Sequence, residues 1–374
     1  MGTHSCKRYH VISSDGSIVP FAREKKLKLI TKSVNMKAWL YSSTEGGLEK
    51  NLVFSPDART PGSPQGDQLL IRVISTSINP ADYKAPAMST VCGKVLIAST
   101  PASPGMDFCG RVIAVGSYPS ARQFTPGQLV FGCLGMPRQF GTLGEFILAS
   151  ANNTAPLPLG VDPDAAATIG VAGRSSYQSI VPYISTPGSR VFINGGSGGC
   201  GIYGIQIAKL LGCHVTVTCS TRNIQFCRDL GADEVIDYTA QDVLETLKSQ
   251  GQIYDHVVDH IGSPEGLYQE CHFFLKPGKV FVQVGASSML TFAHRLIRPS
   301  LLGGGKRKYV ALLMKSHNDE FVQIANWIRE GKIRVEFDAV YEFEDTVRAF
   351  ERLRSGRTRG KIVIHVTSPD SEAA

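Results

Sequence analysis

The chain of 374 residues has no apolar run near the roughly 18 residues that a membrane-spanning helix needs, so it predicts no transmembrane segment. It also lacks a secretory signal, because no apolar core of about 7–15 residues precedes a small-residue cleavage site. Nine cysteines are present, but none forms a CxxC pair or a Cys/His cluster with zinc spacing. Their odd number indicates reduced, mostly buried thiols, which favours an intracellular compartment.

The net charge is small outside the N-terminal segment 1–35. The formal net charge is +7, with 43% hydrophobic and 19% charged residues, which is ordinary for a packed globular protein. Residues 1–35 hold seven basic and two acidic side chains, so the rest of the chain carries only +2. This near-neutral body gives little support to a nucleic-acid partner, and we expect none.

The basic segment 1–35 precedes Met36, which reads like a second start at the opening of the first strand. The segment is basic, poor in acids and moderately rich in Ser and Thr, as a mitochondrial transit peptide is. The alternative is a variable, solvated leader, and we favour that alternative. We therefore expect a cytoplasmic protein, or a mitochondrial one if residues 1–35 are a transit peptide.

The pattern of apolar residues changes along the chain. From residue 36 to about 157 short apolar runs at 69–74, 111–115 and 128–131 alternate with turns, which indicates a β-rich module. From about residue 161 strands alternate with helices, as in a parallel sheet. Six strands are predicted there, at 190–193, 214–218, 234–237, 254–258, 279–284 and 308–313. The count predicts an α/β, doubly wound Rossmann sheet. A helix at 321–329 and a closing strand at 361–365 follow.

The most informative unit is the predicted strand 190–193, a glycine-rich loop and the helix 202–211. The loop reads Gly196-Ser197-Gly198-Gly199-Cys200-Gly201 and fits the pattern GxGxxG. Glycines let the backbone approach a pyrophosphate, and the helix N-terminus supplies N–H donors. Between a strand and a helix, the motif predicts a dinucleotide site rather than a merely structural turn.

The end of the second strand of this unit lacks the acidic residue that binds the ribose hydroxyls of NAD. The sequence there is Cys219-Ser220-Thr221-Arg222-Asn223, and the first later acid is Asp229. The hydroxyl of Ser220 and the guanidinium of Arg222 suit a 2′-phosphate, so we favour NADPH over NADH. The alternative is a helix cap beside a surface arginine.

With these motifs the chain resembles the medium-chain dehydrogenase/reductase superfamily, in its zinc-free quinone-oxidoreductase branch, close to zeta-crystallin-like and reticulon-interacting mitochondrial oxidoreductases. The resemblance covers 36–366. Besides the glycine loop, the matching stretches are 78–82 (INPAD), 104–116 (PGMDFCGRVIAVG), 171–178 (VAGRSSYQ), 231–238 (GADEVIDY) and 357–361 (RTRGK).

The resemblance implies a Rossmann domain inserted in a GroES-like β-barrel catalytic domain. We expect an N-terminal extension at 1–35, the first part of the catalytic domain at 36–160, the Rossmann NADPH-binding domain at 161–316 and the rest of the catalytic domain at 317–374. Relatives commonly form dimers or tetramers through the last Rossmann strand, here 308–313, so a homodimer is expected.

The resemblance also assigns cofactor contacts. It places Tyr238 by the adenosine 2′-phosphate, Ser175 near the nicotinamide, and Gly285 in a loop along the nicotinamide half. The stretch Arg359-Gly360-Lys361 folds back toward the cofactor. For Tyr238 the alternative is an ordinary half-buried tyrosine at a strand end.

Zinc-dependent relatives have Cys where Asn79 stands and a four-cysteine lobe just past residue 110, and this chain has neither. We therefore expect no metal, and a hydride transfer from NADPH to a quinone or an α,β-unsaturated carbonyl without a Lewis acid.

Four residues in and after the stretch 78–82 are candidates for catalysis. Asn79 is predicted beside the nicotinamide or the carbonyl oxygen, although it could be only an Asn-Pro turn residue. Asp82 could orient it or brace the loop. Tyr83 and Lys84 could donate a hydrogen bond or a proton, or could be rim groups. Relatives often have Tyr at the position of Lys84, and segment 85–103 is unusual, so we expect that segment to shape the substrate pocket.

The sequence thus predicts a zinc-independent NADPH-dependent quinone or enone reductase. One alternative is an enoyl reductase that tailors a biosynthetic intermediate of polyketide type. Another is an NADPH-binding structural or interaction protein without activity, because fold alone does not settle function.

Overall fold

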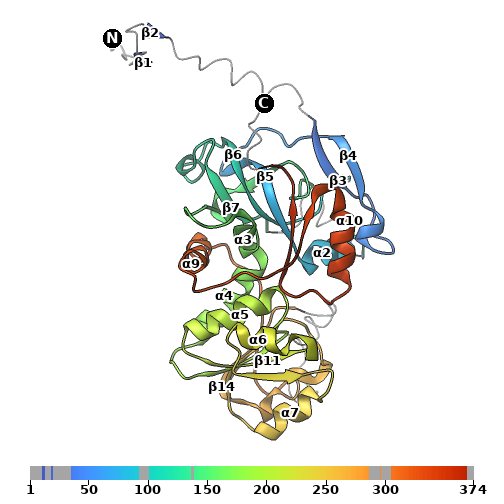
Figure 1. Cartoon of the computed structure of the whole chain (residues 1–374), viewed down its shortest axis with the longest axis vertical. Coiled ribbons are helices and arrows are strands. Elements are labelled where there is room, and N and C mark those ends of the chain that lie inside the picture. The colour runs from blue at the N-terminus through green and yellow to red at the C-terminus, as the bar shows by residue number, and fades with distance from the viewer. Residues whose placement is uncertain are drawn as a thin grey trace.

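The computed structural model describes residues 11–12, 18–19, 35–91, 101–135, 139–285, 295 and 305–368. They form two lobes that are stacked along the long axis of the molecule (Figure 1). One lobe is mainly β-structure and contains both early and late parts of the chain, while the other contains the middle of the chain.

The lobe from the middle of the chain is built on a six-stranded sheet. Its order is β12-β11-β10-β13-β14-β15, and every neighbouring pair is parallel. The strands are β10 (Arg190–Asn194), β11 (His214–Cys219), β12 (Glu234–Asp237), β13 (Tyr254–Asp259), β14 (Leu275–Gln283) and β15 (Lys308–Ala311). The predicted doubly wound sheet is therefore confirmed. The strand order reverses beside β10, and such a switch point leaves a crevice at the carboxyl ends of the strands.

Helices cover both faces of this sheet. They include α4 (Arg174–Ile180), α5 (Gly199–Leu210), α6 (Ile224–Asp229) and α7 (Val243–Gln250). Helix α5 begins at Gly199, inside the glycine-rich stretch and before the predicted start at 202, and ends before Gly212, which has a φ of 73° that glycine adopts without strain. Residues 201–208 are all buried, so the helix is buried on all sides and not only along the predicted face of Ile202, Ile205 and Ala208.

The other lobe is built on a seven-stranded sheet of order β16-β17-β5-β6-β7-β9, with β8 also paired to β5. Its strands are β5 (Gln68–Ile78), β6 (Asp107–Val115), β7 (Leu129–Cys133), β8 (Phe146–Ser150), β9 (Thr154–Pro156), β16 (Phe337–Glu342) and β17 (Lys361–His365). Strand β17 pairs antiparallel with β5, so the late part of the chain completes the early lobe.

Smaller elements surround this sheet. A separate hairpin-like pair joins β3 (Met36–Leu40) to β4 (Val53–Ala58). The helices here are α2 (Pro80–Val91), α3 (Pro163–Ala167), α9 (Asn318–Arg329) and α10 (Thr346–Arg354). Strand β5 extends four residues beyond the predicted 69–74, because Ser75, Thr76 and Ser77 are buried between β6 and β17 and pair with both.

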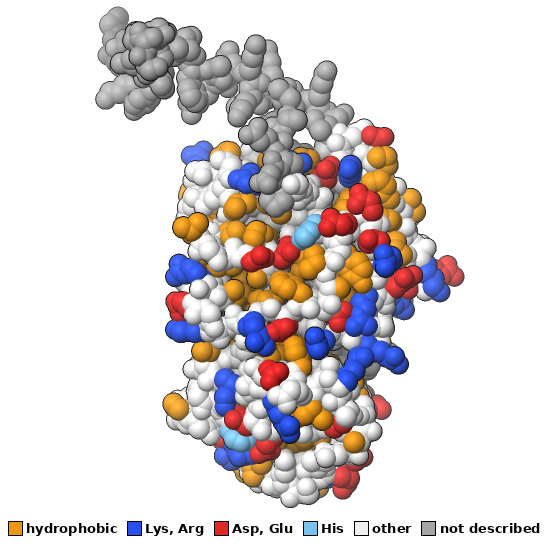
Figure 2. Space-filling view, viewed as in Figure 1, with side chains coloured by type: hydrophobic (Ala, Val, Ile, Leu, Met, Phe, Trp, Pro, Cys, Tyr) orange, Lys and Arg blue, Asp and Glu red, His pale blue; other side chains and the backbone are white. Residues whose placement is uncertain are grey.

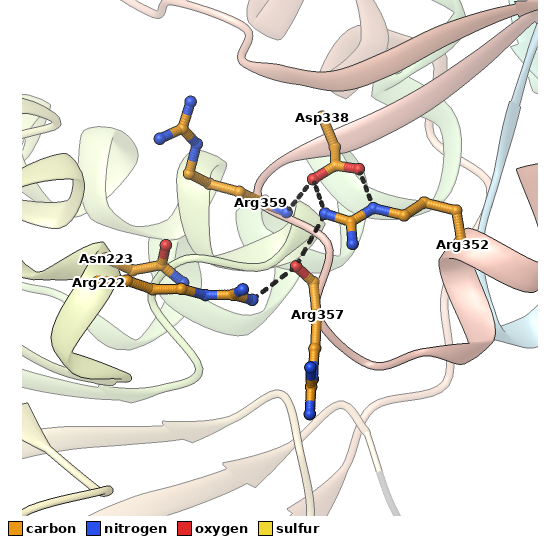
Figure 3. A pocket seen from close by; sticks show the side chains of 6 residues that line it. All are labelled: Arg222, Asn223, Asp338, Arg352, Arg357 and Arg359. Atoms are coloured by element: carbon orange, nitrogen blue, oxygen red, sulfur yellow. Dashed lines mark hydrogen bonds and ion pairs between the residues drawn. The ribbon is translucent and has the colours of Figure 1, made fainter.

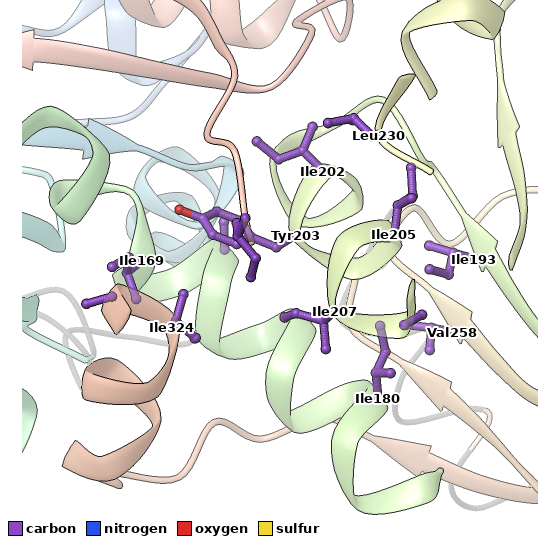
Figure 4. Packing of buried hydrophobic residues seen from close by; sticks show 14 of the residues in the cluster. Ile169, Ile180, Ile193, Ile202, Tyr203, Ile205, Ile207, Leu230, Val258 and Ile324 are labelled. Carbon is purple, nitrogen blue, oxygen red and sulfur yellow. The ribbon is translucent and has the colours of Figure 1, made fainter. Parts of the chain in front are cut away.

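One hydrophobic core spans the junction of the lobes, with α5 at its centre (Figure 4). Ile205 of α5 lies on the side of Ile193 in β10, while Ile169 and Ile324 enter the same cluster from the other side of the helix. Tyr203 lies in the same core, and its hydroxyl is 2.6 Å from Oγ1 of Thr168. The glycine-rich stretch therefore leads into a helix that is buried in this core from residue 201 to residue 208.

All seven cysteines that lie in the described ranges are free thiols, and all but Cys200 are buried, as the sequence indicates. None of the helices in the described part of the chain is long and apolar enough to cross a lipid bilayer.

Candidate active site and cofactor groove

The glycine-rich stretch 196–201 follows β10 and runs into the first turn of α5. Its glycines are required for different reasons. A Cβ on Gly196 would lie 2.7 Å from Cβ of Val217, and one on Gly201 would lie 2.2 Å from the oxygen of Gly195. Both positions are closed to a larger residue. A Cβ on Gly198 would meet no atom closer than 3.8 Å. The loop is thus packed tightly against the sheet and open at Gly198, beside the N–H groups of the first turn of α5.

This arrangement fits the pyrophosphate of a dinucleotide. The first turn of an α-helix has N–H groups without helical partners and carries the positive end of the helix dipole. The open side at Gly198 leaves room for phosphate oxygens to approach those groups. Gly199 and Cys200 belong to this first turn, and Ser197 precedes it with its hydroxyl bonded to the side chain of Asn223 at 3.1 Å.

The stretch Arg359-Gly360-Lys361 lies against the same loop. The amide of Gly360 donates to the oxygen of Ser197 at 2.9 Å, and Gly198 and Gly360 form a parallel bridge. A Cβ on Gly360 would lie 2.1 Å from the oxygen of Glu336, and its φ is 83°. The stretch predicted to fold back toward the cofactor thus lies against the glycine loop, and its contact with a cofactor remains a prediction.

A pocket of about 340 Å³ opens beside this contact (Figure 3). It is lined by Arg222, Asn223, Asp338, Arg352, Arg357 and Arg359. Arg352 donates two hydrogen bonds to Asp338, both at 2.7 Å, so these two charges compensate each other. The guanidinium of Arg222 donates to the main-chain oxygen of Arg357 at 2.9 Å.

The other three arginines make the lining of this pocket basic, and in Figure 3 the guanidiniums of Arg357 and Arg359 point away from that of Arg222. Within the described ranges, Arg222, Arg357 and Arg359 have no carboxylate within salt-bridge distance. Arg359 lies over the ring of Phe226 at 4.9 Å, which leaves it beside the pocket. The space-filling view also shows Lys and Arg side chains gathered near the junction of the lobes (Figure 2). A small anion with several acceptor oxygens fits this pocket.

Ser220 and Tyr238 lie at the carboxyl ends of β11 and β12, next to each other in the sheet. The amide of Tyr238 donates to the oxygen of Cys219 at 3.1 Å, and the side chain of Tyr238 is 57% exposed. The hydroxyl of Ser220 accepts from Asn223 at 3.4 Å. Both predicted contacts therefore lie at the edge that carries Arg222, and their role toward a cofactor remains a prediction.

Ser175 and Gly285 are placed differently. The hydroxyl of Ser175 is buried and directed at the sulfur of Met314, 3.3 Å away. Its neighbour Ser176, which sequence reasoning did not single out, donates to the oxygen of Cys200 at 2.7 Å and so braces α5. A Cβ on Gly285 would lie 1.9 Å from the oxygen of His260, so this glycine is required by close packing at the end of β14.

A buried polar cluster lies behind the glycine loop, and Asn79 is at its centre. The ammonium of Lys361 donates to Oδ1 of Asn79 at 2.6 Å. Nδ2 of Asn79 donates to Asp107 at 2.9 Å and to the oxygen of Ser77 at 3.2 Å. Every hydrogen-bonding group of this amide is engaged inside the protein, and Asn79 is 4% exposed. The prediction that it binds the substrate carbonyl therefore gains no support, because it has no N–H group to offer.

Asp82 joins this cluster through the start of α2. Its carboxylate accepts from the amide of Asn79 at 2.6 Å, so a residue in the first turn bonds back to the residue before the helix. Burial and the charge of Asp107 raise the pKa of Asp82 to about 7. Asp82 therefore braces the loop, one of the two roles predicted for it.

Asp107 completes the cluster and was missed as a site residue. It is fully buried in β6, where its other oxygen accepts from the amide of Val171 at 2.8 Å. Burial raises its pKa, while the ammonium of Lys361, 4.0 Å away, opposes that shift. The pKa of Lys361 is lowered by burial. The sequence could have indicated this role, because Asp107 opens a mostly apolar strand, 107–115, and a carboxylate buried there needs a partner.

Tyr83 and Lys84 do not belong to this cluster. The ring of Tyr83 lies 5.5 Å from the guanidinium of Arg354, which pairs with Glu49 on the outer side of α2. Its predicted role as a donor in the site gains no support from these contacts. Lys84 lies at the surface of α2, but neighbouring atoms still shield part of its side chain from water, and this lowers its pKa. Residues 92–100 of the predicted substrate-pocket segment lie outside the described residues.

No group of three or more His, Cys, Asp or Glu side chains in the described ranges is arranged to hold a metal ion. In particular, the cluster around Asn79 combines two carboxylates with an amide and an ammonium, and the ammonium occupies the position beside the amide oxygen.

Comparisons with known proteins place this geometry in a family. Residues 65–159 match the alcohol dehydrogenase GroES-like domain, and residues 230–364 match the zinc-binding dehydrogenase family. The chain is 41% identical over 345 residues to the trans-enoyl reductase pgmF of Aspergillus terreus, covering 88% of this chain and 96% of that protein. It is 31% identical to the chloroplastic quinone-oxidoreductase homolog of Spinacia oleracea, covering 88% and 98% respectively.

Among solved structures, the quinone oxidoreductase from Coxiella burnetii superposes with a TM-score of 0.78 at 30% identity, covering 89% of this chain and 100% of that one. The GroES-like and Rossmann parts of the predicted fold are thus both confirmed. Proteins of this kind use a nicotinamide cofactor, which agrees with the cradle at Gly198. The chain belongs to the medium-chain dehydrogenase/reductase family of oxidoreductases, among relatives that include quinone oxidoreductases and trans-enoyl reductases.

Proposed function

We propose that this protein is an NADPH-dependent reductase that delivers hydride to an electron-poor carbon conjugated to a carbonyl group, as in a quinone or an enone. The observation that carries the cofactor assignment is the basic pocket beside the glycine loop. Arg222, Arg357 and Arg359 line it, and no acidic residue stands at the end of β11. A 2′-phosphate with its three oxygens suits this pocket, whereas a ribose diol does not need it.

Each part of the groove has a separate task in this proposal. The open side of Gly198 and the first turn of α5 hold the pyrophosphate. Ser220, Tyr238 and the basic pocket hold the adenosine end. Ser175, Gly285 and the backbone of Gly360 and Lys361 border the remainder of the cofactor. When bound, the reduced nicotinamide supplies the hydride.

The residues of this chain must then stabilise the negative charge on the substrate oxygen and provide a proton. We assign this task to Lys84 rather than to Asn79, whose amide is fully engaged. Lys84 is exposed on α2, one turn beyond the buried cluster, and its pKa is lowered by partial burial. A lysine with a reduced pKa is a better proton donor near neutral pH than an ordinary one.

A second candidate function is the reduction of an enoyl group in a biosynthetic intermediate. It is favoured by the 41% identity to a protein named a trans-enoyl reductase. The two candidates share the same hydride chemistry and differ in the size and attachment of the substrate. A third possibility, a cofactor-binding protein without turnover, follows if NADPH binds and no acceptor is reduced.

One screen separates these functions. Purified protein is mixed with NADPH or NADH and with simple quinones, short enones and enoyl thioesters, and the loss of absorbance at the nicotinamide band is recorded. Reduction of quinones or enones with NADPH supports the first candidate. Activity confined to enoyl thioesters supports the second, and equal rates with NADH would contradict the cofactor assignment.

Three further properties belong to the proposal. We propose domain divisions at 36–160, 161–316 and 317–374, with residues 1–35 as an extension. We propose a homodimer joined through β15, whose one strand partner in the described part of the chain is β14, and a monomeric mass by light scattering would reject it. We propose a cytoplasmic location, which mitochondrial import of a fluorescent protein fused to residues 1–35 would overturn.

A further inference from the structure

Lys361 connects the glycine loop to the start of helix α2. Its backbone follows Gly360, which donates to the oxygen of Ser197 in the loop at 2.9 Å. Its aliphatic stem passes directly over Gly199, where a Cβ would lie only 2.9 Å from Cδ of the lysine. The side chain, which projects from the first residue of β17, is therefore confined against the first turn of α5.

The other end of the side chain lies at the start of α2, the helix on which the proposed function places the proton donor. Its ammonium donates to Oδ1 of Asn79 at 2.6 Å and lies 3.4 Å from the oxygen of Ile78. Asp107 receives the amide group of the same Asn79 and lies 4.0 Å from the ammonium. The ammonium of Lys361 and the carboxylate of Asp107 therefore hold the amide of Asn79 in one orientation.

Both charges of this arrangement are buried, which costs solvation free energy. Lys361 is 3% exposed and Asp107 is 0% exposed. A buried ion pair is often no more stable than apolar residues of the same volume, so stability alone does not explain these charges. Such groups can instead specify one arrangement among several, because a displaced partner leaves an unpaired buried charge.

We propose that Lys361 is a positioning residue: with Asp107 it fixes Asn79 and hence the start of α2 relative to the glycine loop, so that cofactor binding at the loop orders the substrate side of the site. The proposal rests on the proposed reductase function. Asn79 directly precedes α2, and Asp82 of the first turn bonds back to it. The position of Lys84 in the next turn follows from that start.

Hydrogen exchange tests this coupling without turnover. In the wild-type protein, NADPH is expected to slow amide exchange in both the glycine loop and residues 82–91 by about fivefold or more, in the usual range for coupling between sites. In Lys361→Met the stem still packs on Gly199, so protection of the loop is retained. Protection of 82–91 is expected to be lost. Equal protection of 82–91 in wild type and variant would overturn the proposal.

A charge-balanced double variant separates positioning from simple destabilisation. Lys361→Met leaves the carboxylate of Asp107 buried without its cation, which by itself can lower stability. Lys361→Met combined with Asp107→Asn removes both charges. If Lys361 acts only structurally, the double variant regains the NADPH-dependent protection of 82–91 together with its melting temperature. Under the proposal it regains stability but not that protection. The double variant also carries the test if the single variant does not fold.

Kinetics provide a second readout. With an acceptor found in the screen, Lys361→Met is expected to lower kcat by about 100-fold, because small misplacements of reacting groups cost that much. The KM for NADPH should change less than about threefold, and the isotope effect with deuterated NADPH should increase. Lys332→Met, on an exposed lysine paired with Glu330, is the control and should behave as wild type. Absence of any wild-type turnover would refute the reductase function and leave the exchange result standing.

Discussion

The guanidinium of Arg222 donates a hydrogen bond to the main-chain oxygen of Arg357 at 2.9 Å, across 135 positions of sequence. Arg222 follows β11 in one lobe, and Arg357 precedes β17 in the other. The bond therefore joins the two lobes at the basic pocket. A substitution of Arg222 removes both a cation of the pocket and this link between the lobes.

We expect Arg222→Ala to weaken NADPH binding by about 1–3 kcal/mol, or about 5- to 150-fold, the range for a charge-assisted hydrogen bond. Binding of NADH should hardly change, because it has no 2′-phosphate. Titration of protein fluorescence with each cofactor measures both constants. Arg348→Ala is a suitable control, because Arg348 of α10 pairs with Asp345 just before that helix and does not line the pocket. An equal loss for both cofactors would contradict the assignment.

The two glycines 198 and 201 provide a matched pair of substitutions. Gly201→Ala should impair folding, since its Cβ would lie 2.2 Å from the oxygen of Gly195. Gly198→Ala should fold normally, because no atom lies within 3.8 Å of its Cβ, but should bind NADPH more weakly by obstructing the open side. Melting temperature and cofactor affinity distinguish the two outcomes. Normal NADPH affinity in Gly198→Ala would show that the pyrophosphate lies elsewhere.

Lys84→Met should lower kcat by about 10²–10⁴-fold, as expected for loss of a proton donor, with NADPH affinity unchanged. In the wild type, activity should decrease as pH rises through the pKa of Lys84, because the donor must be protonated and partial burial lowers that pKa. Tyr83→Phe is the control on the adjacent position, since Tyr83 faces Arg354. A greater loss in the tyrosine variant than in the lysine variant would reverse the two roles.

The ion pair between His365 and Asp164 should make stability depend on pH. Partial burial lowers the pKa of His365, but the hydrogen bond to Asp164 at 2.8 Å and the nearby Glu342 outweigh this and raise it. A raised pKa means that the stabilisation is complete below the ordinary pKa of histidine, about 6.5, and is lost as pH rises through the higher folded value.

The expected effect is under about 1 kcal/mol, because the side chain of His365 is partly exposed and solvent screens the pair. Urea unfolding at several pH values from about 6 to 8 measures it. In His365→Asn the decline of stability with pH should be smaller than in the wild type. An unchanged slope would mean that other groups cause the pH dependence.

The sequence predicts the parts of the fold that depend on local patterns. The glycine loop with its flanking strand and helix, and the number of parallel strands in a doubly wound sheet, follow from periodicity and from turn residues. The length of β5 does not, because Ser75, Thr76 and Ser77 are polar and become strand only through pairing with β6 and β17.

The site was less predictable for the same reason. Arg222 could be selected from its place after β11, but its partner Arg357 is brought there by the other lobe. The bond from Lys361 to Asn79 joins residues 282 positions apart, and no local pattern indicates it. Neighbouring residues also diverge, since Asp82 turns inward while Tyr83 turns outward toward Arg354.

The place of β17 between β16 and β5 has a consequence for how the protein is made. The strands of the parallel sheet are contiguous in the chain from residue 190 to 311, so this sheet can be completed while synthesis is still in progress. The other sheet lacks an interior strand until residues 361–365 leave the ribosome. During that interval residues 68–72 of β5 can pair with β8, but residues 75–78 lack their β17 partner, and an exposed strand edge invites association with other chains. Strand β17 thus both completes the sheet and brings Lys361 to the site.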